Sequence, residues 1–94
     1  MKTWKIKQIK TWKIRQYLPA LLLYIQRRVD GERGFLVAVR VRDICGIDRR
    51  CGIVVHWLMR NLAEKGLARQ HKKGTYLIER RAAEEVLSAL REWI

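Results

Sequence analysis

The sequence predicts an α+β domain that is mainly α-helical and carries a small antiparallel β-sheet. Its 94 residues are 49% hydrophobic and 32% charged, which is a globular composition and a length that supports one core. Several stretches repeat apolar residues at helical spacing. Between them lie three short segments with the pattern of strands. No apolar run is long enough to span a bilayer.

We divide the chain into a basic N-terminal arm, residues 1–17, and a domain, residues 18–94. The arm contains no acidic residue. Trp4, Ile6, Trp12 and Ile14 share even parity, and together with Ile9 they scatter around a helix, which favours an extended segment over an amphipathic helix. The cations of the arm are Lys2, Lys5, Lys7, Lys10, Lys13 and Arg15.

Three elements are expected in the first half of the domain. Pro19 suits the first turn of a helix, and the apolar spacing that follows predicts a helix over residues 19–29. Residues 35–41 alternate β-branched and other residues and predict a strand. A very short helix over residues 42–47 is expected next.

A longer helix is expected over residues 49–65, because Asp48 can cap its first turn and Gly66 can end it. Residues 67–70 and 75–78 flank a basic turn and predict a β-hairpin. A last helix is expected over residues 81–93. The core face of the helix over residues 49–65 is predicted to hold Cys51, Val55, Leu58, Met59 and Leu62.

The formal net charge of +12 makes a polyanion the expected partner. Nucleic acid is the first candidate, and an anionic membrane surface is the second. A membrane-bound arm is disfavoured because the arm lacks a helical apolar stripe. The interleaved charges at the N-terminus do not form a secretory signal, so a cytoplasmic location is expected.

The order of these elements resembles the winged helix-turn-helix fold of the MarR-like and related archaeal regulators. The likeness is carried by the run Val41-Arg-Asp-Ile-Cys-Gly-Ile-Asp48 and by the junction Leu62-Ala-Glu-Lys-Gly-Leu67 with the basic hairpin after it. It covers about residues 19–94. The short second helix and its two cysteines depart from the family pattern. The resemblance implies a double-stranded DNA-binding protein, either a transcriptional regulator or a chromatin-type protein.

In such folds the third helix enters the major groove and the hairpin, or wing, contacts the backbone or minor groove. The resemblance therefore implies DNA contacts from the outer face of the helix over residues 49–65, from the wing, and from the start of the second helix. The arm can lie along the minor groove. The predicted contact residues outside the arm are Arg49, Arg50, Ile53, His56, Trp57, Arg60, Arg40, Arg42, Arg69, His71, Lys72 and Lys73.

Ile53 and Trp57 are unusual on this face because apolar side chains there need a reason to meet water. They could touch thymine methyl groups, cover the arm, or form a protein interface. The alternative function is therefore a winged-helix protein interaction module built on these two residues.

Cys45 and Cys51 are both expected to face inward. Buried free thiols are the ordinary interpretation for an intracellular protein. A disulfide between them is the alternative, since hyperthermophile proteins keep intracellular disulfides and the Arg-rich, Asn-poor composition agrees with such a source.

No metal site, cofactor, small-molecule substrate or enzyme activity is expected. The cysteines and histidines lack zinc-ligand spacing. The single serine, Ser88, has no evident base and orienting group.

A homodimer is expected, because the last helix carries more large apolar residues than its length requires and dimers read paired half-sites. The predicted interface comprises Val86, Leu87, Leu90 and Trp93.

Overall fold

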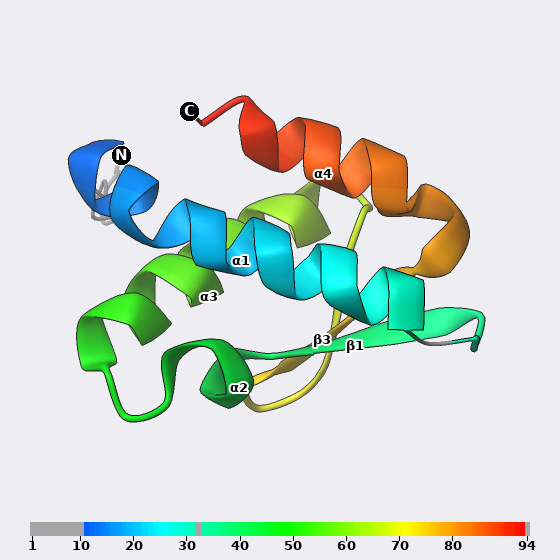
Figure 1. Ribbon diagram of the computed structural model, residues 1–94, viewed down its shortest axis with the longest axis horizontal. Coiled ribbons are helices and arrows are strands. Elements are labelled where there is room, and N and C mark those ends of the chain that lie inside the picture. Colours follow the sequence, from blue (N-terminus) through cyan, green and yellow to red (C-terminus); the bar gives the residue numbers. More distant parts are fainter. Residues whose placement is uncertain (1–10, 32, 94) are drawn as a thin grey trace.

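The computed structural model describes residues 11–31 and 33–93, in which helices predominate over a small antiparallel sheet, as the sequence predicts (Figure 1). The strands lie in the order β1-β3-β2, and both pairings are antiparallel. Helices α1, α3 and α4 cover one face of this sheet. The elements are α1 (Thr11–Gly31), β1 (Leu36–Arg40), α2 (Val41–Cys45), α3 (Arg49–Glu64), β2 (Arg69–Lys72), β3 (Thr75–Glu79), the 3-10 turn η1 (Arg80–Ala82) and α4 (Ala83–Arg91).

The alternating residues of β1 divide the sheet into an inner and an outer face. Val37 and Val39 are fully buried, and they lie opposite Ile78 and Tyr76 of β3, which are buried as well. The residues between them point away from the helices, because successive side chains of a strand alternate. The predicted strand over residues 35–41 is thus confirmed over residues 36–40.

Helix α1 begins at Thr11, eight residues before the predicted start, so the extended arm predicted for residues 1–17 is wrong for residues 11–17. The reason is a helical stripe that starts inside the supposed arm. Ile14, Leu18, Leu21 and Ile25 are all buried and recur at intervals of four, three and four residues. Pro19 lies inside the helix on its exposed side. The arm's remaining part, residues 1–10, lies outside the described residues.

Replacing Ile14 by alanine tests this helix start. We expect Ile14→Ala to lower the free energy of unfolding by about 2–5 kcal/mol, because a buried aliphatic side chain leaves a cavity. Trp12→Ala is the matched control, since Trp12 is 59% exposed, and it should change stability by less than about 0.5 kcal/mol. Urea unfolding followed by circular dichroism measures both. Equal effects of the two variants would contradict a helix that contributes Ile14 to the core.

Helix α3 has the ends that the sequence predicts. The Asp48 side chain caps it by accepting a hydrogen bond from the Cys51 amide at 3.1 Å. At the other end the Leu67 amide donates to the Leu62 carbonyl, and Gly66 takes a positive φ of 78°. This is a Schellman termination. Because Leu67 takes part in ending the helix, β2 starts at residue 69 rather than at the predicted residue 67.

The two cysteines form a disulfide, so the second of the two interpretations is the correct one. Cys45 ends α2 and Cys51 lies in the first turn of α3, and their Cα atoms are 5.4 Å apart. The bond encloses the turn that carries the Asp48 cap. It therefore ties the end of α2 to the start of α3.

Reduction of this disulfide should lower the free energy of unfolding by about 2 kcal/mol, the chain-entropy value for so short a loop. The expected result is a lower melting temperature in the presence of a phosphine reductant. The double variant Cys45→Ala/Cys51→Ala serves as the control, because its melting temperature should be low and independent of reductant. A wild-type melting curve unchanged by reductant would contradict the prediction, once alkylation and intact mass had shown that both thiols were free.

The last helix closes the core of its own chain. Val86, Leu87 and Leu90 are at most 3% exposed and pack among the core residues of α1 and α3. The prediction that these three residues form a dimer interface is therefore wrong for this structure. A domain of this size has little apolar surface to spare, and α4 is needed to cover the remaining core. A homodimer stays a prediction, on some other surface.

Candidate nucleic-acid interface

A basic groove lies where the C-terminal end of β1, the start of α2, the middle of α3 and the β2–β3 turn come together. Its volume is about 760 Å³. Four exposed cations from two separate parts of the chain line it. We call it the basic groove. Five of the DNA-contact residues predicted from the sequence line it: Arg40, Arg42, His56, Lys72 and Lys73.

Local backbone geometry holds the two sides of the groove together. Strand β1 passes into α2 without a loop, so Arg40 and Arg42 lie at a fixed junction. The backbone amide of Val41, which lies between these two arginines, donates a hydrogen bond to the Gly74 carbonyl at 3.0 Å. Gly74 has a φ of 80°, a conformation that glycine adopts without strain. The hairpin turn, with Lys73, is thereby hydrogen-bonded to the start of α2.

One carboxylate, Asp43, also lines the basic groove, and Tyr24 of α1 holds it. The Tyr24 hydroxyl donates to Asp43 Oδ2 at 3.1 Å and accepts from the Arg40 amide at 3.4 Å. Burial raises the pKa of Tyr24, so the hydroxyl remains a donor at neutral pH. Asp43 is thus directed toward Tyr24, and the four cations that line the groove outnumber its one carboxylate.

His56 joins the basic groove to the core. Its Nδ1 lies 2.9 Å from the hydroxyl of Tyr76, a fully buried residue of β3. The two rings meet edge to face with centroids 5.7 Å apart. Burial lowers the pKa of His56 below 6.5, and the positive charge of Arg60 lowers it further. The imidazole is therefore uncharged at neutral pH, with one nitrogen committed to Tyr76.

This environment makes part of the stability depend on pH. Because the folded-state pKa of His56 is depressed, its contribution is fully present above pH 6.5 and is lost as pH falls through the folded-state pKa. We expect the wild type to lose more stability between pH 7 and about 5 than His56→Gln does. Urea unfolding at each pH measures the difference. His71→Gln is the control, since His71 is exposed on β2, and it should keep the wild-type profile.

The outer face of α3 continues from the basic groove. Arg49, Ile53 and Arg60 are exposed there, and Ile53 is 59% exposed. Arg50 is exposed at the start of the same helix. The face therefore presents three arginines and one aliphatic side chain to a partner.

Trp57 is covered by the end of the chain rather than presented on this face. Its ring meets Trp93 edge to face, with centroids 4.9 Å apart and planes at 73°. Lys65 and Glu92 form an ion pair beside them at 3.8 Å. Trp93, which is predicted to lie in a dimer interface, thus contacts Trp57 of its own chain. This contact accounts for one of the two apolar residues that the sequence places on the outer face.

The remaining predicted residues are dispersed. Arg69 lies at the start of β2 and lines a different pocket, on the outer face of the sheet. His71 is exposed on β2, between Gln70 and Lys72, where the pairing with β3 shifts register. Lys13 and Arg15 belong to α1. Lys2, Lys5, Lys7 and Lys10 lie outside the described residues.

Three residues that shape the site, Tyr24, Asp43 and Tyr76, were not predicted from the sequence. Tyr24 and Asp43 are 19 positions apart, and His56 and Tyr76 are 20 apart, so neither pair has a helical or strand spacing. Asp43 alone could have been noticed, as an acid between arginines. Their roles follow from the packing of α1 and β3 against the groove.

Comparisons of the chain with protein-family models, with curated proteins and with solved structures found no match. In the part of the chain that the structure describes, no three side chains from His, Cys, Asp and Glu gather where they could hold a metal ion. No helix of residues 11–31 and 33–93 has the length and apolarity to cross a membrane.

Proposed function

We propose that this protein binds double-stranded DNA through a winged helix. One observation carries the proposal: four exposed cations of the β1–α2 junction and the β2–β3 turn converge on one groove beside the exposed arginines of α3. A positive surface of this kind attracts the phosphate backbone whatever the base sequence.

The arrangement of elements supports the winged-helix assignment. Helices α2 and α3 are joined by a three-residue turn, and an antiparallel hairpin whose second strand pairs with β1 follows α3. On this assignment α2 and α3 are the helix-turn-helix, α3 is the recognition helix, and the β2–β3 hairpin is the wing. A major groove about 12 Å wide accepts a helix such as α3.

The candidate contacts fall into two classes. Arg40, Arg42, Lys72 and Lys73 suit phosphates, because they come from both sides of a groove and need no base geometry. Arg49 and Arg60 on α3 suit guanine edges, which accept two hydrogen bonds from a guanidinium. Ile53 suits a thymine methyl group. The four lysines of residues 1–10 add positive charge that we propose lies along the minor groove.

Titration of random and genomic duplex DNA at several salt concentrations tests the proposal. We expect affinity for random duplex to fall steeply and linearly with salt on logarithmic axes, because bound cations release counterions. A tighter genomic subset would indicate a transcriptional regulator, and equal affinities a chromatin-type protein. Absence of salt-dependent binding to any duplex would overturn the proposal.

A protein interaction module is the second candidate, and the exposure of Ile53 favours it. Ile47, in the turn before α3, is fully exposed as well. An interface built on these two residues would bind a protein partner with little dependence on salt, in contrast to a DNA contact. The half-buried position of Trp57 against Trp93 weakens this candidate.

A further inference from the structure

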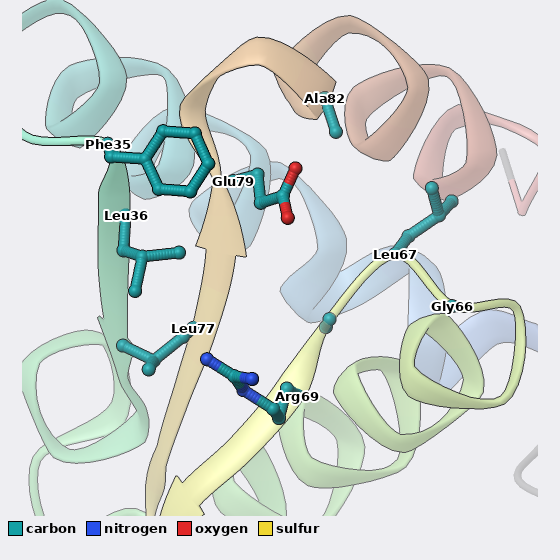
Figure 2. A pocket seen from close by; sticks show the side chains of 9 residues that line it. Phe35, Leu36, Gly66, Leu67, Arg69, Leu77, Glu79 and Ala82 are labelled. Carbon is teal, nitrogen blue, oxygen red and sulfur yellow. The ribbon is translucent and has the colours of Figure 1, made fainter.

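The outer face of the sheet carries an apolar surface at the end opposite the basic groove. A shallow pocket of about 560 Å³ is formed there over the start of β1, the end of β3 and the start of β2 (Figure 2). Its apolar wall comes from Phe35, Leu36, Leu67, Leu77 and Ala82. Helix α1 lies behind the strands in this view, the end of α3 and the η1–α4 segment flank them, and no described helix crosses in front of them.

Two of these apolar side chains are exposed and the other three are half-buried. Phe35 is 60% and Leu36 is 37% exposed, and Leu77 lies half-buried between them and β2. The guanidinium of Arg81 stands over the Phe35 ring, 5.7 Å from its centroid. Contiguous exposed apolar groups rimmed by charges are typical of an interaction site.

The charged groups of the rim have opposite signs and lie on different sides of the apolar centre. Arg69 comes from β2, and Figure 2 shows its guanidinium directed toward Leu77. Glu79 ends β3, and its carboxylate binds Arg81 Nε through Oε1 at 2.9 Å. Among the described residues, Arg69 forms no ion pair within the chain. The surface thus offers the cation of Arg69 beside Leu77, and beside Leu36 the Glu79 carboxylate, which Arg81 already pairs within the chain.

We propose that this face, defined by Phe35, Leu36, Leu77, Arg69 and Glu79, is where two copies of the chain meet around a two-fold axis. In a two-fold interface the same patch serves on both sides, so it must be complementary to itself. An apolar centre with an arginine on one side and a glutamate on the other meets that condition. Arg69 of each copy then lies opposite Glu79 of the other.

The charge distribution also selects this face. Each copy has a formal net charge of +12, which repels a second copy over most of the surface. At this face Glu79 offsets part of the positive charge of Arg69 and Arg81. The basic groove lies at the far ends of the same strands, at Arg40 and Thr75. It stays open in both copies.

Sedimentation equilibrium of the full chain without DNA tests the pairing separately from the proposed function. We expect a mass of twice 11.2 kDa at high micromolar concentration, and we expect added salt to preserve or strengthen it. Leu36→Glu should give a monomer. The matched control is Leu23→Glu, since Leu23 is 51% exposed on α1, and it should keep the wild-type mass. A monomeric wild type, or a Leu36→Glu variant that still dimerises, would overturn the proposal whether or not DNA binds.

A charge exchange tests the pairing of the two rim residues and keeps the proposal testable should Leu36→Glu fail to fold. Arg69→Glu and Glu79→Arg should each weaken association about tenfold, because each sets like charges opposite one another at two symmetric contacts. The double variant should recover the wild-type association. Single variants without effect, or a double variant no tighter than the singles, would show that the copies meet elsewhere and would overturn the proposal.

Discussion

The variant in which Arg40, Arg42, Lys72 and Lys73 are all alanine is expected to lose most of its affinity for random duplex DNA. If each cation contacts one phosphate, the slope of log affinity against log salt should flatten by roughly 0.9 for each cation removed. At low salt the affinity should fall on the order of a hundredfold or more, because charge-assisted hydrogen bonds are lost along with attraction. Fluorescence anisotropy of a labelled duplex measures both quantities.

A second set of four exposed cations provides the matched control. Arg27, Arg33, Lys65 and Arg91 line neither the basic groove nor the pocket on the sheet. Replacing these four by alanine lowers the net charge equally and so reports the effect of the overall field alone. We expect a much smaller loss of affinity. Equal losses from both variants would mean that net charge, rather than the groove, binds the DNA.

Leu90→Glu is expected to unfold the protein or bring it close to unfolding. Leu90 is 1% exposed in the core, and an unpaired carboxylate there should cost at least about 3–5 kcal/mol. The whole free energy of unfolding of a chain this long is only roughly 5–14 kcal/mol. Circular dichroism during thermal and urea unfolding measures the loss.

Ser88→Glu is the control for this substitution, because Ser88 is exposed on the same helix. It adds the same charge without burying it, and we expect nearly wild-type stability. The pair also separates two views of α4. If Leu90→Glu kept its stability and only changed its mass in solution, the helix would be an interface, as the sequence alone had indicated, rather than part of the core.

Sequence reasoning was most accurate where the determinants are local. The limits of α3 follow from a cap at Asp48, a glycine at residue 66 and an apolar stripe between them, all within one segment. The hairpin follows from the turn before Thr75, and it is displaced by two residues only where Leu67 closes α3. These signals need no knowledge of the neighbouring elements.

It failed where two elements compete for the same residues. The even parity of Trp12 and Ile14 favoured an extended arm, whereas burial of Ile14 against the core favours a helix. The apolar face of α4 could serve a partner or its own chain, and burial of Leu90 shows that it serves its own chain. Periodicity indicates that a face is apolar, but not what covers it.

The candidate site was likewise predictable only in part. The basic residues were evident from composition, but their grouping required the sheet. Pairing of β1 with β3 brings Arg40 opposite Thr75, next to the hairpin turn. The pairing of β2 with β3 places Arg69 opposite Leu77, toward the other end of the sheet from Lys72, although the two residues are close in sequence.

The strand order has a consequence for a chain during its synthesis. Among the described strands β1 pairs only with β3, whose last residue comes almost forty positions later. Until Tyr76 and Ile78 have left the ribosome, Val39 and Val37 have no sheet partners, and α1 has no complete surface to cover. The side chain of Arg80, which donates to the Gly34 and Val29 carbonyls, cannot join the end of α1 to β1 before then. Closure of the core is therefore a late event that depends on nearly the whole chain.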